Sequence, residues 1–281
     1  MKNHGVFRTF WYSANILLIV SLLTIVYSGV WEFSTRSYLK GFSDAIVPYS
    51  DSPEHKVEAI LTWMRNGPAR RVASDPNALA LRDPEQTLNY KELLEVCGTA
   101  TNAFVNLAAS SGLESRRLLL LDENRSAKHV VAEVLIDGTW AVADPSYRIL
   151  WRSPAGKLLS REELRDETTF RLATQASPNY PPNYTFESTV HIRLGRIPIL
   201  GRHLRRVLTA VWPAWEEQIN WTLLAEREPF ALLTVSILLF FFALVWRLLL
   251  GWYGVHRLGI ARVRLRDQFI RAGGVLLSNS K

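Results

Sequence analysis

The sequence predicts an α+β domain between two membrane-spanning helices. Three observations lead to this prediction: two long apolar runs near the ends of the 281-residue chain, a helix-like segment that begins at Cys97, and a strand–turn–strand pattern that follows it. A chain of this length forms one or two domains. The chain has a single cysteine, and this residue lies in the middle part of the sequence with the candidate partners His129 and Asp144.

The first apolar run carries no formal charge between Arg8 and Glu32. As a helix, residues 9–31 would cross a hydrocarbon core of about 30 Å, and aromatic residues near both ends of the run are typical of membrane interfaces. A cleaved signal peptide is the alternative, but its apolar core would extend only about 7–15 residues before a cleavage site with small residues. This run is longer and ends in a poor cleavage site, so we expect an uncleaved anchor.

The second apolar run, PFALLTVSILLFFFALVW, begins at Pro229. It predicts a spanning helix over residues 229–251, in which Arg247 extends its charged end toward the membrane surface. A buried core helix is the alternative, which an unbroken uncharged run of this length disfavours. The tail at 252–281 is rich in arginine, and residues 1–8 carry Lys2 and Arg8. Because Lys and Arg prefer the cytoplasmic side, we expect both termini in the cytoplasm and the middle domain outside the cytoplasmic membrane.

The distribution of charge argues against nucleic acid as a partner. The net charge is +7, of which residues 1–33 contribute +1 and residues 247–281 contribute +6, so the middle of the chain sums to zero. A basic excess beside apolar runs is a membrane pattern rather than a nucleic-acid footprint. The single cysteine excludes an intramolecular disulfide and a zinc site built from several thiolates.

Residues 50–150 are expected to form the folded domain. Ser50–Pro53 begins a helix that ends near Asn66, and a second helix begins at Cys97 and ends near Gly112. The inner face of the first helix consists of Val57, Ile60, Leu61 and Met64. The inner face of the second helix consists of Ala100, Ala103, Phe104, Leu107 and Ala108.

The segments that follow are rich in Val, Leu and Ile, which favours strands over residues 117–121, 129–136 and 139–142. Asp137-Gly138 between the last two strands is a strong signal for a two-residue hairpin turn. Beyond residue 150, residues 151–190 are expected to form an extension, in which the Pro-rich segment 177–184 is a linker or an extended arm.

The hairpin turn fixes which residues face each other. Counting outward from the turn places Asp144 opposite Val131, and His129 lies two residues from Val131 on the same face. Diagonal neighbours of this kind lie about 5–8 Å apart at Cβ, so the imidazole of His129 can reach the carboxylate of Asp144. The alternate side chains face an apolar layer on the other side: Val130, Ala132, Val134 and Ile136. A helix that carries Cys97 would need only to pack across the His129 face to bring its thiol to the imidazole.

Residues 191–228 are expected to be an amphipathic juxtamembrane segment. Arginine and tryptophan residues gather between Ile197 and Trp221. This composition fits a helix that lies on a membrane surface. A stalk or packing helix with a solvated basic face is the alternative, and the sequence does not separate the two.

Cysteine, histidine and aspartate in this order, on a helix start and two strands, are the parts of a thiol acyl-transfer site. A helix N-terminus and a neighbouring imidazolium both lower the pKa of a thiol, and a carboxylate orients the imidazole. Each residue also has a simpler interpretation: Cys97 as a small buried apolar residue, His129 as a surface strand residue, and Asp144 as part of a strand-ending turn. Together with Glu133, His129 forms an H-x-x-x-E pair, which could bind a metal if the segment were a helix. The β-branched residues around the pair predict a strand instead, so metal binding is disfavoured.

The segments VCGTATNAFVNLAASSGLESRRLLL and HVVAEVLIDGTWAVADPSY resemble the cysteine helix, the histidine strand and the aspartate strand of bacterial transglutaminase-like domains. The shared features are a cysteine at a helix start, H-x-x-x-E, G-x-W and D-P. Two positions depart from the family pattern, Val131 in place of an aromatic residue and Val96 in place of a small or polar one.

The resemblance implies a fold similar to that of papain-like cysteine peptidases, with Cys97 as nucleophile, His129 as general base and acid, and Asp144 as the residue that orients it. Gln86, Asn89 and Tyr90 are weak candidates for an oxyanion donor. The expected activity is that of a cysteine protease, amidase or transamidase on a peptide or protein substrate, without a metal or another cofactor.

A catalytically silent domain that acts as an envelope scaffold is the alternative function. In that case the Pro-rich segment and the Trp/Arg segment would contact other envelope proteins.

Overall fold

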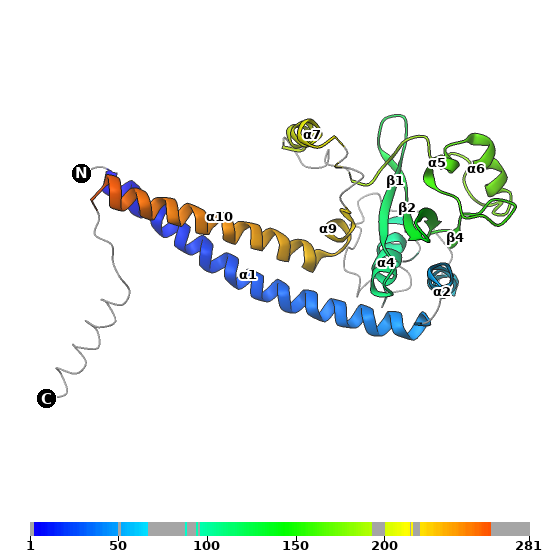
Figure 1. Cartoon of the computed structure of the whole chain (residues 1–281), viewed down its shortest axis with the longest axis horizontal. Helices are drawn as coiled ribbons and strands as arrows, with labels where there is room; N and C mark the ends of the chain where they lie inside the picture. The colour runs from blue at the N-terminus through cyan, green and yellow to red at the C-terminus, as the bar shows by residue number, and fades with distance from the viewer. Residues whose placement is uncertain are drawn as a thin grey trace. The chain divides into compact units, whose positions relative to one another are not determined.

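The computed structural model describes residues 3–49, 52–66, 96–192, 200–213 and 220–259, together with Leu88, Leu94 and Trp215. The chain divides into two compact units, one formed by residues 1–27 and 232–281 and the other by residues 28–231. The elements, shown in Figure 1, are α1 (Asn3–Ile46), α2 (Pro53–Arg65), α4 (Cys97–Ser110), β1 (Ser115–Leu121), β2 (Ala127–Ile136), β3 (Thr139–Asp144), β4 (Ile149–Leu150), α5 (Arg161–Leu164), α6 (Glu167–Thr174), β5 (Thr189–Val190), α7 (Leu200–Val211), α9 (Thr222–Glu226) and α10 (Glu228–Arg257). The predicted α+β class is confirmed.

The described strands form one antiparallel sheet in the order β4–β3–β2–β1–β5. The predicted hairpin of β2 and β3 is present, with Ile136 opposite Thr139 and Ala132 opposite Ala143. Asp137 and Gly138 have φ values of 48° and 82°, and two successive positive φ values are what a tight two-residue turn requires. The predicted register is therefore confirmed.

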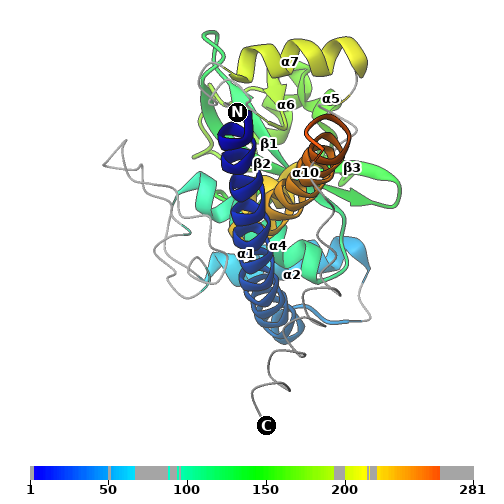
Figure 2. The same ribbon diagram turned by 90° about the vertical axis from the view of Figure 1, so that its left-hand side faces the viewer.

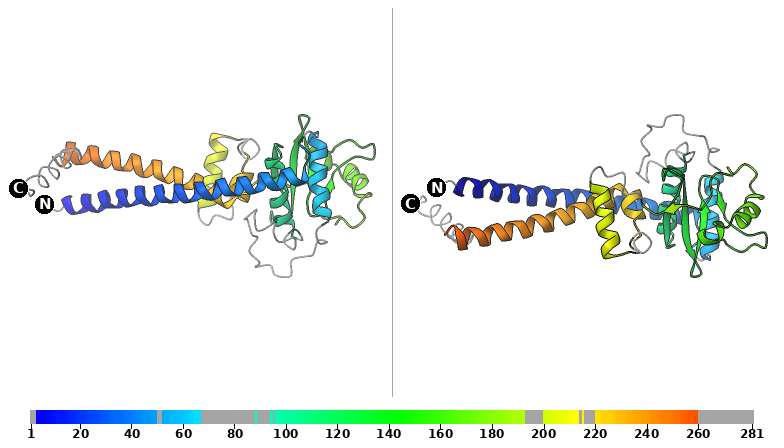
Figure 3. Two further views of the ribbon diagram at one scale, coloured as in Figure 1. Left: turned by 90° about the horizontal axis from the view of Figure 1, so that it is seen from below. Right: turned by 90° about the horizontal axis from the view of Figure 1, so that it is seen from above.

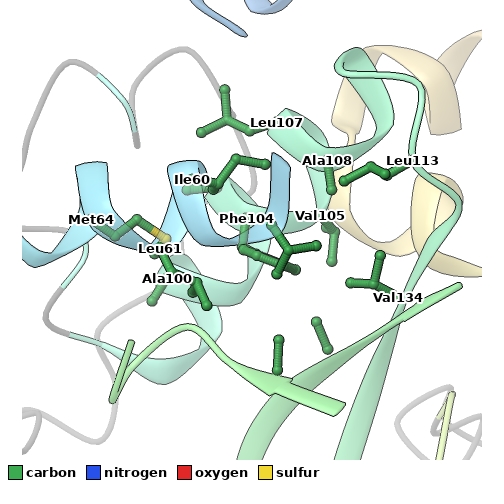
Figure 4. Close-up of a cluster of buried hydrophobic side chains, with 14 of the residues drawn as sticks. Ile60, Leu61, Met64, Ala100, Phe104, Val105, Leu107, Ala108, Leu113 and Val134 are labelled. Carbon is green, nitrogen blue, oxygen red and sulfur yellow. The ribbon is translucent and has the colours of Figure 1, made fainter. Parts of the chain in front are cut away.

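One face of the sheet packs against α2 and α4. Figure 4 shows Ile60 and Leu61 of α2 meeting Phe104 of α4 above the sheet, where Val134 of β2 lies. All the side chains predicted for the inner faces of both helices are buried. Full burial of one side chain of this size stabilises the fold by about 1.5–3 kcal/mol, so this layer holds α4 firmly on the sheet.

The body of α4 covers the apolar face of β2 and not the His129 face that the sequence analysis considered for it. The helix packs against Ala132, Val134 and Ile136, on the opposite face of β2 from His129. That face of β2 is apolar, whereas the other face carries the ionisable groups of His129 and Glu133. Burial of apolar surface favours the first face, because burying a polar group without a partner costs free energy.

Local signals in the sequence set the ends of both helices. Ser52 caps α2, and its hydroxyl accepts a hydrogen bond of 3.3 Å from the backbone N–H of His55. After α4, Gly112 has a φ of 80°, and the N–H of Leu113 donates to the carbonyl of Ala108 at 2.9 Å. This is the glycine-dependent helix end that the sequence predicts at Gly112.

The other face of the sheet is covered by α5, α6 and the segment that follows them. Leu118, Leu120 and Val131 of the sheet form one apolar cluster with residues from 151 to 186. Tyr180 and Phe186 of this cluster are buried, although they lie in or next to the segment expected to be a linker or an extended arm. The packed domain therefore continues beyond residue 150.

The helix α1 continues well past the predicted span. Its last turns bring Leu39, Phe42 and Ile46 against the α2 and α4 layer, where the ring of Phe42 lies 5.1 Å from that of Trp63. These apolar residues recur three or four positions apart, which is the spacing of one helix face. The sequence analysis considered the uncharged run only, so it did not predict this amphipathic continuation of α1.

A buried polar network fixes the residues next to the apolar runs onto α4. Arg227 donates to Glu32 at 3.1 Å and to Asn106 of α4 at 2.9 Å. Asn102 of α4 donates to the carboxylate of Glu226 at 3.1 Å. All five residues are buried, so the charges are paired within the domain instead of being solvated.

Within the unit formed by residues 1–27 and 232–281, α1 and α10 run side by side and antiparallel (Figure 3). The ring of Phe10 lies 6.1 Å from that of Trp246, and Arg247 donates to Asn15 at 2.7 Å. The guanidinium of Arg247 also lies 4.5 Å from the ring of Trp11. Both helices are long and apolar enough to cross a membrane. Most residues of their apolar stretches are not buried by other parts of the protein. The two helices thus indicate membrane association, and Arg247 finds a polar partner on the neighbouring helix instead of reaching for the surface.

Candidate functional site

Cys97 is the first residue of α4. The preceding residue, Val96, is extended and provides no side-chain cap for the first turn of the helix. The hydroxyl of Thr101 donates to the carbonyl of Val130 at 3.1 Å, which ties the start of α4 to β2. The Cys97 side chain is half-buried and packs against the cluster that contains Val130, next to His129 in the chain. The first turn of the helix therefore presents a partly accessible thiol beside the histidine strand.

His129 and Asp144 meet on adjacent strands, as the hairpin register predicts. The Nε2 atom of His129 lies 2.6 Å from Oδ2 of Asp144, and both side chains are 0% exposed. A hydrogen bond of this length between a buried imidazole and a buried carboxylate orients the ring firmly. The pairing of β1 with β2 is irregular at this point, because Leu120 pairs with His129 whereas Leu121 pairs with Ala127.

Backbone groups hold the carboxylate of Asp144 in place. Its Oδ1 atom accepts hydrogen bonds from the N–H groups of Ser146 at 3.0 Å and Tyr147 at 3.2 Å. The chain turns at this point, after the Asp144-Pro145 pair. One carboxylate oxygen therefore anchors the turn, while the other is directed to His129.

The electrostatic environment favours a protonated imidazole. Burial by itself lowers the pKa of His129, but the charge and hydrogen bond of Asp144, together with the contact and charge of Cys97, outweigh it. The pKa of His129 is raised from 6.5 to about 9. Asp144 and Cys97 are thus the two groups that hold the proton on the ring.

The second ring nitrogen of His129 is available to Cys97. Nε2 is engaged by Asp144, and Nδ1 has no nitrogen or oxygen partner among the described residues. Nδ1 is therefore the ring nitrogen that is left to exchange a proton with a group other than Asp144. The structure therefore places His129 against Asp144 and brings Cys97 close enough to raise the pKa of the ring.

Three tyrosines that the sequence analysis did not single out surround His129. The ring of Tyr184 is stacked on the imidazole at 4.3 Å and 9°, whereas the rings of Tyr147 and Tyr180 meet it edge-on at 5.8 Å and 6.3 Å. Burial, and then the neighbouring charge of Asp144, raise the pKa of Tyr180 well above its usual value, so its hydroxyl stays protonated. The family's aromatic position two residues after the histidine is Val131 here, and these rings come from other parts of the chain. The signal available in the sequence was the single tyrosine at the end of each of the segments PSY, SPNY and PPNY.

Glu133 belongs to a separate buried cluster on the same face of β2. Its Oε2 atom lies 2.7 Å from Nε of Arg116 and 2.7 Å from Nε2 of His191. His129 and Glu133 stand four residues apart on a strand, which separates them by about 13 Å, so they do not form the chelating pair that a helix would give. In the described part of the chain, no three His, Cys, Asp or Glu side chains gather as a metal site requires.

The weak oxyanion candidates Gln86, Asn89 and Tyr90 lie outside the described residues. For the described part of the site, the backbone N–H groups at the start of α4 are the donors closest to the thiol along the chain. They point along the helix axis toward its N-terminus, where a helix favours negative charge.

The comparisons with known proteins agree with this architecture. Residues 40–145 match the family model described as the transglutaminase-like superfamily. This part of the chain is a transglutaminase-like domain, and the protein combines it with two helices that have the length and composition of membrane spans. Neither the curated proteins nor the solved structures gave a match.

Proposed function

We propose that this protein is a membrane-anchored cysteine acyl-transfer enzyme in which Cys97, His129 and Asp144 form the catalytic triad. The single observation that carries the proposal is the buried 2.6 Å contact of His129 with Asp144, in a ring whose pKa is raised to about 9 beside Cys97. An imidazolium that is retained at neutral pH stabilises a thiolate, which is the reactive form of cysteine.

The first half of the reaction forms a thioester. The Cys97 thiolate attacks the carbonyl carbon of an amide, and the negative charge that develops on the carbonyl oxygen is stabilised by N–H groups at the start of α4. His129 then donates its proton to the leaving amine, the C–N bond breaks, and the acyl group remains on sulfur. Throughout, Asp144 keeps the ring oriented and balances its charge.

The second half of the reaction transfers the acyl group. His129 removes a proton from the acceptor, which attacks the thioester carbonyl, and the thiolate leaves as the C–S bond breaks. Water as acceptor makes the enzyme a protease or an amidase, and an amine makes it a transamidase. The substrate class is therefore a peptide or protein amide, and the chemistry needs no metal or organic cofactor.

The absence of any other cysteine makes the test direct, because every thiol label reports Cys97. We expect the native full-length protein in detergent to react with an acylating amide-mimetic probe, and Cys97→Ala to abolish the label. His129→Gln should slow labelling about 10²-fold or more, which is the usual contribution of a positioned acid–base group. His203→Gln, at an exposed position on α7, is the matched control and should react like the wild type. Labelling of His129→Gln at the wild-type rate would refute the triad.

A catalytically silent scaffold is the second candidate function, and the complete burial of His129 beneath Tyr184 favours it. The two candidate functions predict different results in a genetic rescue experiment. If a deletion phenotype is rescued by Cys97→Ala but not by a chain that lacks residues 191–221, the scaffold function is correct. The reverse result supports the enzyme.

The domain is proposed to lie in the periplasm, with both termini in the cytoplasm. The support is the arginine-rich tail after α10 together with Lys2 and Arg8 at the other end of the chain. In a Cys97→Ala background, Glu123→Cys offers an exposed position between β1 and β2. A membrane-impermeant maleimide should label this residue in cells whose outer membrane is permeabilised and whose inner membrane is intact. In the same cells, a C-terminal tag should stay protected from added protease. Protection of Glu123→Cys under these conditions would overturn the proposed topology.

A further inference from the structure

We propose that α7 lies in the membrane interface as an amphipathic helix, with its apolar face in the lipid and its arginines among anionic headgroups. The occupant of this helix face is thus a phospholipid surface. This inference is independent of the catalytic function, because it uses residues outside the transglutaminase-like domain.

The apolar face of α7 is defined by spacing and by exposure. Apolar residues occur at positions 200, 204, 207, 208 and 211, which fall on one side of a helix. Val207 and Val211 on this side are 59% and 81% exposed, and Trp212 just beyond the helix is 43% exposed. Neighbouring large apolar side chains with this exposure mark an interaction surface rather than a solvated helix face.

The opposite face of α7 is basic. Arg205 and Arg206 are exposed, as is His203 near the boundary of the two faces. Figure 2 shows α7 from the side as one continuous helix, so both faces extend along its length. Arginine on the polar face and an aromatic residue at the end of the apolar face are the composition of helices that bind at the surface of anionic membranes.

Within the described part of the chain, the packing of α7 leaves its apolar face open. The indole of Trp215, which is buried, donates to Thr209 at 3.2 Å, and its ring lies 5.6 Å from that of Trp221. Thr209 lies nearly opposite Val207 and Val211 around the helix, because successive residues are about 100° apart. The contact therefore holds α7 by its polar side.

The length and the tether of α7 favour a lipid surface over a soluble partner. A helix of 12 residues is about 18 Å long, which is too short to cross a hydrocarbon core but suits a position parallel to its surface. The same chain carries two helices of membrane-spanning length, so lipid is always present at high effective concentration. A protein partner would have to compete with that surface for the same apolar residues.

The test uses the full chain in a Cys97→Ala background, with one engineered cysteine that carries an environment-sensitive fluorophore. Val207→Cys and Val211→Cys report the apolar face, Arg206→Cys reports the basic face, and Glu123→Cys is the exposed control in the domain. Each variant is reconstituted into phosphatidylcholine vesicles with or without phosphatidylglycerol, and quenching by nitroxide-labelled lipid is compared with quenching by aqueous iodide.

We expect the labels at Val207→Cys and Val211→Cys to show blue-shifted emission, severalfold stronger lipid quenching than the Glu123→Cys label, and loss of iodide quenching. The Arg206→Cys label should remain open to iodide, and the depth of the apolar labels should decrease without phosphatidylglycerol. Equal iodide quenching at Val211→Cys and Glu123→Cys would overturn the proposal. Protection of Val211→Cys from both quenchers would also overturn it, since that result indicates a covering protein or a second copy of the chain.

Discussion

Replacing Asp144 by Asn tests the electrostatics of the site with the smallest change in shape. The amide oxygen can keep the hydrogen bonds that Oδ1 of Asp144 accepts from the backbone N–H groups of Ser146 and Tyr147. The amide nitrogen, however, takes the place of Oδ2 and is a donor. Nε2 of His129 must then accept a hydrogen bond, so the proton of the neutral ring moves to Nδ1, on the side of Cys97.

The size of the effect follows from the raised pKa of His129. In the wild type the pKa is about 9, against 6.5 for an unperturbed histidine. This rise of about 2.5 pH units is worth about 3 kcal/mol, at 1.36 kcal/mol per unit. Without the charge of Asp144, Cys97 is the remaining group that opposes burial, and we expect burial to outweigh it, so that the pKa of His129 falls below 6.5. At pH 7.5 about a tenth or less of the imidazole is then protonated, whereas nearly all of it is protonated in the wild type.

His129 also makes the stability of the domain depend on pH. Because the pKa of His129 is higher in the folded protein, its contribution is fully present below pH 6.5 and is lost as the pH rises through about 9. We therefore expect the wild-type domain to lose about 3 kcal/mol of stability over this range from His129. The Asp144→Asn variant should show no such loss.

The assay is a histidine NMR titration of the full chain in detergent, with His129→Gln to assign the resonance. Asp166→Asn is the matched control, because it makes the same substitution at an exposed helix cap of α6 and should leave His129 unchanged. Iodoacetamide labelling of Cys97 at pH 7.5 should slow by about tenfold in Asp144→Asn, following the fraction of protonated imidazole. If His129 titrates near 9 in Asp144→Asn, or near 6.5 in the wild type, the electrostatic reasoning is refuted.

Three further predictions concern the surroundings of the site. Tyr184→Ala removes the ring stacked on His129 and should slow Cys97 labelling about fivefold, since a cation–π contact of this kind contributes about 1 kcal/mol, whereas Tyr184→Phe should keep the rate. Phe104→Ala opens a cavity between α4 and the sheet and should destabilise the domain by about 3–5 kcal/mol in thermal unfolding; a cost below 1 kcal/mol would contradict this packing. Arg227→Met removes the buried partner of Glu32 and should cost about 3 kcal/mol in the same measurement, with unchanged stability as the contrary result.

The local sequence predicted most of the elements that form the site. The cap at Ser52 and the glycine at Gly112 were recognisable, because a helix end depends on a few neighbouring residues. The turn at Asp137-Gly138 fixed the register, and the register was enough to bring His129 to Asp144. These features need only the period of a strand and the geometry of one turn.

Other parts of the site came from residues far apart in the chain. Tyr184 lies in the Pro-rich segment whose composition predicts a linker or an extended arm. Nothing in its local sequence pattern indicates that its ring stacks on His129. The continuation of α1 to Ile46 was also missed, because its charged residues interrupt the apolar run while Leu39 and Phe42 still share one buried face.

The sequence by itself determined two apolar helices of spanning length, the His129–Asp144 hairpin and the position of Cys97 at a helix start. Run length, side-chain alternation and turn chemistry are properties of adjacent residues, so they can be followed along the chain. Only the tertiary structure decided that α4 covers the apolar face of β2, that tyrosines enclose His129, and that Arg227 links Glu32 to Asn106. These arrangements depend on which distant surfaces bury the most apolar area and pair their buried charges, and that choice is made by the whole fold.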